Sequence, residues 1–514
     1  MVGTLVAVTA LALGSHSPSA RQDGYALVQL TPAAACVETI PLLEAGATPV
    51  APSLRLFRLP VAAARRLAPG LRGHGALQTF ELDRPVVTAS VRDTQPDPLE
   101  PGEWWRAVIG IDGLTPPGPG RPVTVVDSGL DLGHPEFLSR PDTLALNPQE
   151  PAPFGGEHGT SVASLVGAPV NGVGMVGVYP QAALRSWDTA LGNGTEIDTS
   201  EVVKGIVAAA DNGPGVINLS LGSSERDGLI EQAIDEAFAK GSLVVVASGN
   251  DGDRGNPPEY PADYPHVLTV GATGADNTVA GFSSRSPYVD LVAPGQDVTV
   301  ATASDSSWHV ESGTSFSTPI VSGAAAWVWT ARPQLDNTQL FEIMRRSAVD
   351  IGARGRDDAS GYGLLNVAAA LAYPAPPRDP LEPNDDVDFV QPDAASFNGH
   401  GPLTTLSRRR AALTARLDRL EDPSDVYRIW LPAWKRVLVT AVSNANVTLR
   451  VWGPDTLTVD EAERADLLGK DARARSGRKQ VMVGRATTGR WGYVEVTLGG
   501  RRGLQASYSL SVIG

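Results

Sequence analysis

Short apolar runs that alternate with helical patterns constrain the fold of the middle of the chain most strongly. The runs are continuous and rich in β-branched residues, as expected of strands that are buried on both faces. They are PVTVVDSG, GVINLSLGS, SLVVVASGN and HVLTVGAT. Helical segments such as EVVKGIVAAADNG and DGLIEQAIDEAFAKG lie between them. This α/β alternation predicts a parallel sheet with helices on both faces, which binds ligands at the carboxyl ends of its strands.

Two proline-rich, acidic joints, at residues 93–103 and 373–386, divide the 514-residue chain, which is long enough for several domains. Beyond the second joint, runs such as KRVLVTAV and WGYVEVTL are separated by turn residues, a pattern that is typical of an antiparallel sandwich. We predict a small α/β domain over residues 21–95, the parallel α/β domain over 101–373, a linker over 374–386 and a β-sandwich over 387–514.

The N-terminus and the composition bear on location and partners. Residues 2–13 are apolar or small, too short a stretch to span a bilayer and about right for a signal-peptide core. We therefore expect residues 1–20 to be a signal peptide and the protein to be secreted, with no permanent membrane anchor. The net charge of −15 argues against binding to nucleic acid or anionic membranes. A single cysteine, Cys36, excludes an intrachain disulfide framework.

Four residues with catalytic chemistry stand at predicted strand ends or at a helix start. Asp127 ends a strand in VVDSGLDLGHPEF, and His158 precedes small residues in EHGTSVASLVG. Ser315 opens a long apolar helix in GTSFSTPIVSGAAA. A serine nucleophile needs a base to take its proton, and the base needs a buried carboxylate that orients it. The helix N-terminus and the amide of Asn250, which follows the strand VVVASGND, can stabilise an oxyanion.

Other interpretations of these residues stay open at this point. Asp127 can be an ordinary Asp-Ser-Gly turn former, and Asn250 can be a simple turn residue. A serine at a helix start is often only an N-cap. His134, in the same motif as Asp127, is a rival base.

Taken together, the motifs resemble those of the subtilisin-like serine proteases, the subtilases. The order of aspartate, histidine and serine along the chain matches, as do the stretches VVDSGLDLGHPEF, HGTSVASLVG, INLSLGS, VVVASGND and GTSFSTPIVSGAAA. The resemblance implies a subtilisin-like fold for the α/β domain. Phe316, Ser317 and Ser161 stand where the family usually has methionine, alanine and a second histidine. These departures flank the catalytic atoms and bear on rate and pocket shape more than on mechanism.

The resemblance implies a secreted serine endopeptidase that acts on proteins or peptides and is made as a self-processed zymogen. Residues 21–95 look like an inhibitory propeptide, and the C-terminal domain resembles the bacterial pre-peptidase C-terminal domain. A monomer is expected, and the chemistry requires no cofactor. Subtilases often bind structural calcium, but no loop here has a spacing that identifies metal ligands. Two other functions remain open, namely a catalytically inactive binding protein and an esterase that uses the same triad.

The resemblance also assigns substrate-binding residues in two segments. The first segment would pair as a strand with the substrate backbone, and both would wall the main specificity pocket. The residues are Ser220, Leu221 and Gly222 in the first segment and Ala247, Ser248, Gly249 and Asp251 in the second. Because Ala247, Ser248 and Gly249 are small and neutral, we expect Leu, Phe or Tyr to be preferred before the cut bond. Asp251 at the rim would add a weak attraction for Lys or Arg.

Overall fold

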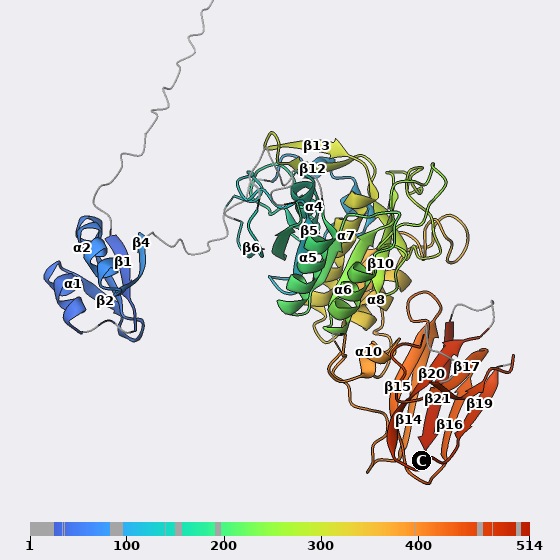
Figure 1. The fold of residues 1–514 in the computed structure, drawn as a ribbon. Coiled ribbons are helices and arrows are strands. Elements are labelled where there is room, and N and C mark those ends of the chain that lie inside the picture. The colour runs from blue at the N-terminus through green and yellow to red at the C-terminus, as the bar shows by residue number, and fades with distance from the viewer. Residues whose placement is uncertain are drawn as a thin grey trace, which may run out of the picture. The chain divides into compact units, whose positions relative to one another are not determined.

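The structure is a computed structural model, and its chain divides into two compact units, residues 1–93 and 94–514. We describe each unit by itself (Figure 1). The structure describes residues 25–514 except 33, 35, 83–95, 139, 150–156, 191–196, 395, 460–465, 475 and 500–504. The predicted signal peptide lies outside the described residues.

The first unit is a four-stranded antiparallel sheet with a helix packed on one face. The strand order is β2-β3-β1-β4. Val28 and Leu59 of the strands form a small core with Ala64 and Leu71 of helix α2. The elements are β1 (Tyr25–Leu30), α1 (Ile40–Glu44), β2 (Thr48–Ala51), β3 (Leu56–Pro60), α2 (Val61–Gly73) and β4 (Leu77–Leu82), with short 3-10 turns at Cys36–Thr39 and Pro52–Leu54.

The second unit begins with the predicted parallel sheet, which has seven strands in the order β11-β10-β9-β8-β5-β7-β6. Side chains alternate between its faces. Val245 packs in the core with α4 (Glu157–Gly167), α7 (Thr314–Ala331) and α8 (Asn337–Arg346), whereas Val244 and Val246 pack on the other face with α5 (Thr199–Asp211) and α6 (Gly228–Ala239). The sheet strands are β5 (Pro122–Asp127), β6 (Thr143–Ala145), β7 (Ala183–Asp188), β8 (Val216–Leu219), β9 (Leu243–Ala247), β10 (Val267–Thr273) and β11 (Leu291–Pro294).

Helices cover both faces of this sheet (Figure 1), and a short hairpin packs against α4 (Glu157–Gly167). The helices are α3 (Trp105–Val108), α4 (Glu157–Gly167), α5 (Thr199–Asp211), α6 (Gly228–Ala239), α7 (Thr314–Ala331), α8 (Asn337–Arg346) and α9 (Val367–Ala372), with a 3-10 turn at Glu100–Gly102. The hairpin consists of β12 (Val298–Thr302) and β13 (Ser307–Glu311). The parallel sheet with helices on both faces that the sequence predicts for this region is confirmed.

The C-terminal region contains two antiparallel sheets, with the strand orders β14-β21-β16-β19 and β15-β20-β17-β18. Val439 and Leu510 from the first sheet share one core with Leu449 and Val494 from the second, so the sheets pack as a sandwich. The elements are α10 (Val387–Val390), β14 (Arg410–Asp418), β15 (Ser424–Leu431), β16 (Val437–Ser443), β17 (Val447–Trp452), β18 (Leu467–Asp471), β19 (Gly477–Val483), β20 (Arg490–Leu498) and β21 (Gln505–Ile513).

The predicted linker over residues 374–386 is anchored to the α/β region. Nε2 of Gln339 donates to the carbonyl oxygen of Pro376 at 2.6 Å. His266 bridges Asp235 and Asp385 with ring nitrogen–oxygen distances of 2.9 and 2.6 Å. The linker is therefore held on the α/β region by polar contacts from the buried side chains of Gln339 and His266. Among the helices that the structure describes, none is both long and apolar enough to cross a membrane.

Candidate active site

Asp127 and His158 meet at the carboxyl end of the interior strand β5. The last residue of β5 is Asp127, and His158 lies in the first turn of α4. Nδ1 of His158 lies 2.8 and 3.0 Å from the two carboxylate oxygens of Asp127. A Cβ atom on Gly159 would collide with the carbonyl oxygen of Gly129, so glycine lets the start of α4 approach the loop after β5. The carboxylate of Asp127 is buried, while the ring of His158 stays partly accessible.

The environment of His158 favours its protonated form. Burial lowers the pKa of His158, but the charge and hydrogen bond of Asp127 together with the charge of Glu311 outweigh it, so the pKa is raised above 6.5. The ring can therefore accept a proton and hold it next to a buried carboxylate.

Ser315 lies in the first turn of α7, beside this pair. The ring of Phe316, the next residue, has its centroid 5.9 Å from that of His158. Ser315 is also joined to Ser220: the Ser220 hydroxyl donates to the Ser315 carbonyl oxygen at 2.9 Å, and the Ser315 hydroxyl donates to the Ser220 carbonyl oxygen at 3.3 Å. Most of α7 is buried in the core, which makes the helix a rigid support for the hydroxyl.

Asn250 follows strand β9, and its side chain is held by Thr314. Oδ1 of Asn250 accepts hydrogen bonds from the backbone N–H and the hydroxyl of Thr314, at 2.9 and 3.1 Å. The Nδ2 group is left as the donor at the exposed end of the side chain. The structure thus brings Asp127, His158, Asn250 and Ser315 to one edge of the sheet. The contact with Thr314 was missed by the sequence reasoning, although Thr314 belongs to the same hydroxyl-rich stretch.

The predicted substrate-binding segments follow two adjacent strands. Ser220, Leu221 and Gly222 come directly after β8. Ala247 is the last residue of β9, and Ser248 and Gly249 lead from it to Asn250. Asp251 pairs with the exposed Arg254 at 3.3 Å. The sequence reasoning also missed Glu259, whose side chain lies against both Gly222 and Gly249. Nothing local marks Glu259, because the loop that carries it has no periodic pattern.

His134, the rival base, is buried away from these groups. Its Nε2 lies 3.1 Å from the carbonyl oxygen of Ser307, and its Nδ1 accepts from the backbone N–H of Glu136 at 3.1 Å. Both ring nitrogens are thus engaged, and burial lowers the pKa of His134. This environment is that of a neutral structural histidine.

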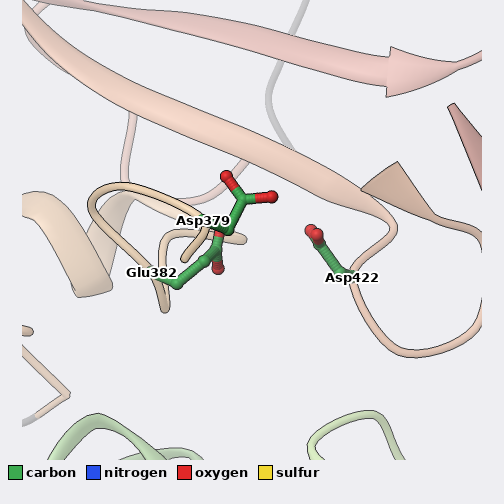
Figure 2. A group of neighbouring side chains, drawn as sticks. All are labelled: Asp379, Glu382 and Asp422. Atoms are coloured by element: carbon green, nitrogen blue, oxygen red, sulfur yellow. The ribbon is translucent and has the colours of Figure 1, made fainter. Parts of the chain in front are cut away.

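A group of acidic side chains near the second joint has the chemistry of a metal site. Asp379, Glu382 and Asp422 each offer a carboxylate oxygen, and these oxygens lie within 4.8 Å of one another. Figure 2 shows Asp379 and Glu382 close together, with Asp422 facing them from another segment. Burial and neighbouring carboxylates raise the pKa values of Glu382 and Asp422, and burial raises that of Asp379 to about 6. The group borders a cavity of about 710 Å³.

Comparisons with known proteins agree with this geometry. Residues 118–363 match the Subtilase family. Subtilisin Savinase of Lederbergia lenta is 38% identical over 259 residues, which are 50% of this chain and 92% of that protein. The minor extracellular protease Epr of Bacillus subtilis is 34% identical over 273 residues, 53% of this chain but only 41% of Epr.

A solved structure extends the likeness in fold beyond the α/β region. Fervidolysin from Fervidobacterium pennivorans, described as a keratinolytic enzyme related to subtilisin, matches 89% of this chain and 85% of its own. The TM-score is 0.51, with 19% sequence identity. The fold, the family match and the identity to Savinase show that the chain belongs to the subtilase family of serine endopeptidases.

Proposed function

We propose that the protein is a secreted endopeptidase in which Ser315 is the nucleophile, His158 the base, Asp127 the orienting carboxylate and Asn250 an oxyanion donor. One observation carries this assignment. The hydrogen-bonded pair of Asp127 and His158 lies beside a serine at the start of a buried helix, and Thr314 fixes the neighbouring amide.

The geometry supports a two-step acyl transfer. Nδ1 of His158 is bound to Asp127, which leaves Nε2 to take the proton of the Ser315 hydroxyl. The serine oxygen then bonds to the carbonyl carbon of the scissile peptide, and the oxyanion accepts hydrogen bonds from Nδ2 of Asn250 and from N–H groups at the start of α7. His158 gives its proton to the leaving amine. Water repeats the sequence on the acyl-enzyme and frees Ser315.

We further propose that the N-terminal unit is a propeptide. It would inhibit the active site of its own chain and assist the folding of that chain. This unit has its own antiparallel sheet and core, and it precedes the α/β region in the chain. Secretion is supported by the name of the relative Epr, a minor extracellular protease, and by the apolar residues 2–13 of this chain. Self-processing would couple maturation to an assembled active site.

Expression in a protease-free host tests this function. The wild-type protein should lose its N-terminal part, react with a fluorophosphonate probe and hydrolyse casein. Ser315→Ala should stay full length, unlabelled and inactive, whereas Ser312→Ala, in the same hydroxyl-rich stretch, should behave as wild type. Maturation of Ser315→Ala would contradict self-processing. If the protein hydrolyses esters but not peptides, it is an esterase. If the wild-type protein is not labelled by the probe at all, it is an inactive binding protein.

We also propose that Asp379, Glu382 and Asp422 bind a structural calcium ion. All three supply oxygen ligands, the donor type that Ca²⁺ prefers. Oδ1 of Asp379 and Oδ1 of Asp422 are buried without a hydrogen-bond partner among the described residues, which fits ligands that lack their cation. The ion would offset the mutual repulsion of the carboxylates and stabilise the second joint.

Thermal unfolding tests the calcium site apart from catalysis. Calcium should raise the Tm of inactive Ser315→Ala, and EDTA should lower it. Asp422→Asn should abolish this response, whereas Asp358→Asn, which removes an exposed acid elsewhere, should keep it. If the Tm of Asp422→Asn still responds to calcium, the ion binds at another site.

A further inference from the structure

Glu259 fills the space between the two segments that the sequence assigns to the specificity pocket. A Cβ atom on Gly222 would collide with Oε1 of Glu259. A Cβ atom on Gly249 would lie 2.9 Å from Cγ and 3.0 Å from Cδ of the same side chain. The Glu259 side chain therefore contacts both walls, and it can do so because both walls have glycine at the point of contact.

The backbone around Glu259 is fixed to the same segment that contacts the nucleophile. Ser223 and Tyr260 exchange two backbone hydrogen bonds of 2.8 Å each, in an antiparallel bridge. Ser220, three residues earlier, is bonded to Ser315 through its hydroxyl and its carbonyl oxygen. The position of Glu259 relative to Ser315 is thus set by short, hydrogen-bonded connections rather than by a free loop.

The charge of Glu259 is not compensated. Within the described residues, the charged side chains that act on its carboxylate are Asp251 and Asp263, and both are negative. Asp251 has a partner of its own in Arg254. Glu259 is partly buried, so its charge is less screened by water than that of a surface acid. Such a carboxylate attracts a cation that can enter from the substrate side.

We propose that Glu259 determines substrate specificity by binding the guanidinium or ammonium group of an arginine or lysine directly before the scissile bond. This inference rests on the proposed function, because it assigns a role within the same site. It replaces the expectation of a neutral pocket that prefers Leu, Phe or Tyr. Basic residues would be favoured because a charge-assisted hydrogen bond to a partly desolvated carboxylate is stronger than a neutral one.

Matched peptides that differ only in the residue before the cut test this proposal. The substrates carry Arg, Lys or Leu there, and a fluorophosphonate probe counts the active sites. For the wild-type enzyme, kcat/KM should be higher for Arg than for Leu. Glu259→Gln should lower the Arg-to-Leu ratio about ten- to a hundredfold, with Leu cleavage retained. Asp251→Asn should change the ratio less, and Asp253→Asn, an exposed acid in the same loop, should leave it unchanged.

Each other outcome has a distinct meaning. If the wild-type enzyme cleaves the Leu peptide with a kcat/KM equal to or higher than that for the Arg peptide, the role of Glu259 is overturned. This result does not depend on the folding of any variant. A larger loss in Asp251→Asn than in Glu259→Gln also overturns it. In both cases the proposed protease function survives, because peptides are still cut. An enzyme that neither cuts any peptide nor reacts with the probe overturns the proposed function itself.

Discussion

Oδ1 of Asn250 accepts two hydrogen bonds from Thr314, one from the backbone N–H at 2.9 Å and one from the hydroxyl at 3.1 Å. Thr314 is fully buried in the first turn of α7, so its donors are held in place by the core. The amide of Asn250 is thereby oriented, with its Nδ2 group as the end that remains for a substrate. Orientation fixed before substrate arrives is what makes such a donor effective in a transition state.

We expect Asn250→Ala to lower kcat by roughly 10²–10³-fold with little change in KM, because the amide would act on the oxyanion of the transition state. Thr314→Val keeps the backbone bond and loses only the hydroxyl bond. Its kcat should fall by about three- to tenfold, because a neutral hydrogen bond contributes about 1 kcal/mol. Steady-state kinetics on one peptide measure both, with Thr330→Val near the far end of α7 as the control. An effect of Asn250→Ala that is confined to KM would show that Asn250 is not an oxyanion donor.

Activity should depend on the protonation of His158, because only the neutral ring can take the serine proton. The raised pKa of His158 places the acid limb of kcat/KM above pH 6.5, with activity lost as pH falls through that pKa. Asp127→Asn removes the main charge that raises the pKa, so the midpoint should move to lower pH while the rate also falls.

Glu311→Gln is the matched variant for this pH profile. Glu311 adds charge without a hydrogen bond to His158, so its removal should cause a smaller shift in the same direction. Because Glu311 is exposed, salt should reduce its contribution. A midpoint that stays fixed in Asp127→Asn would show that another group controls the acid limb.

The fold around these residues was predictable because buried parallel strands leave a local signature. The runs ending at Asp127 and at Leu219 are mainly apolar and buried on both faces, and the topology brings their carboxyl ends to one edge. The long apolar stretch after Ser315 likewise marks a buried helix without reference to its neighbours. The proposed catalytic residues could therefore be named from strand ends and a helix start.

The anchoring of the second joint could not be predicted in this way. Proline and acidic residues suggest a tether between separate cores, but His266 holds Asp385 from more than a hundred residues away in the chain. Glu259 was missed for the same reason. Its place beside Gly222 depends on the bridge between Ser223 and Tyr260, a long-range pairing that no local pattern encodes.

The His266 bridge should make stability sensitive to alkaline pH. Burial lowers the pKa of His266, but the charges and hydrogen bonds of Asp385 and Asp235 outweigh it and raise the pKa to about 10. The stabilisation is fully present below about pH 6.5, the ordinary histidine pKa, and is lost as pH rises toward 10. The free energy of unfolding should fall by about 1.4 kcal/mol per pH unit in this window.

Thermal unfolding of inactive Ser315→Ala between pH 6 and 10 measures this dependence without self-digestion. Adding His266→Gln should lower the Tm at pH 6 and flatten its decline, since a neutral amide cannot titrate. The exposed His400 provides the control, because His400→Gln should leave the profile unchanged. An equally steep decline in the His266 variant would assign the alkaline transition to other groups.

The preference for arginine should itself depend on pH. Burial, followed by the charges of Asp251 and Asp263, raises the pKa of Glu259 to about 6. Glu259 is therefore neutral at pH 5 and ionised at pH 7.5, while an arginine side chain stays charged throughout. The Arg-to-Leu ratio of kcat/KM should rise with pH, with a midpoint near 6. Protonation of His158 lowers both rates alike and cancels in the ratio. Glu259→Gln should give a flat ratio, and a flat wild-type ratio would show that the carboxylate does not contact the substrate cation.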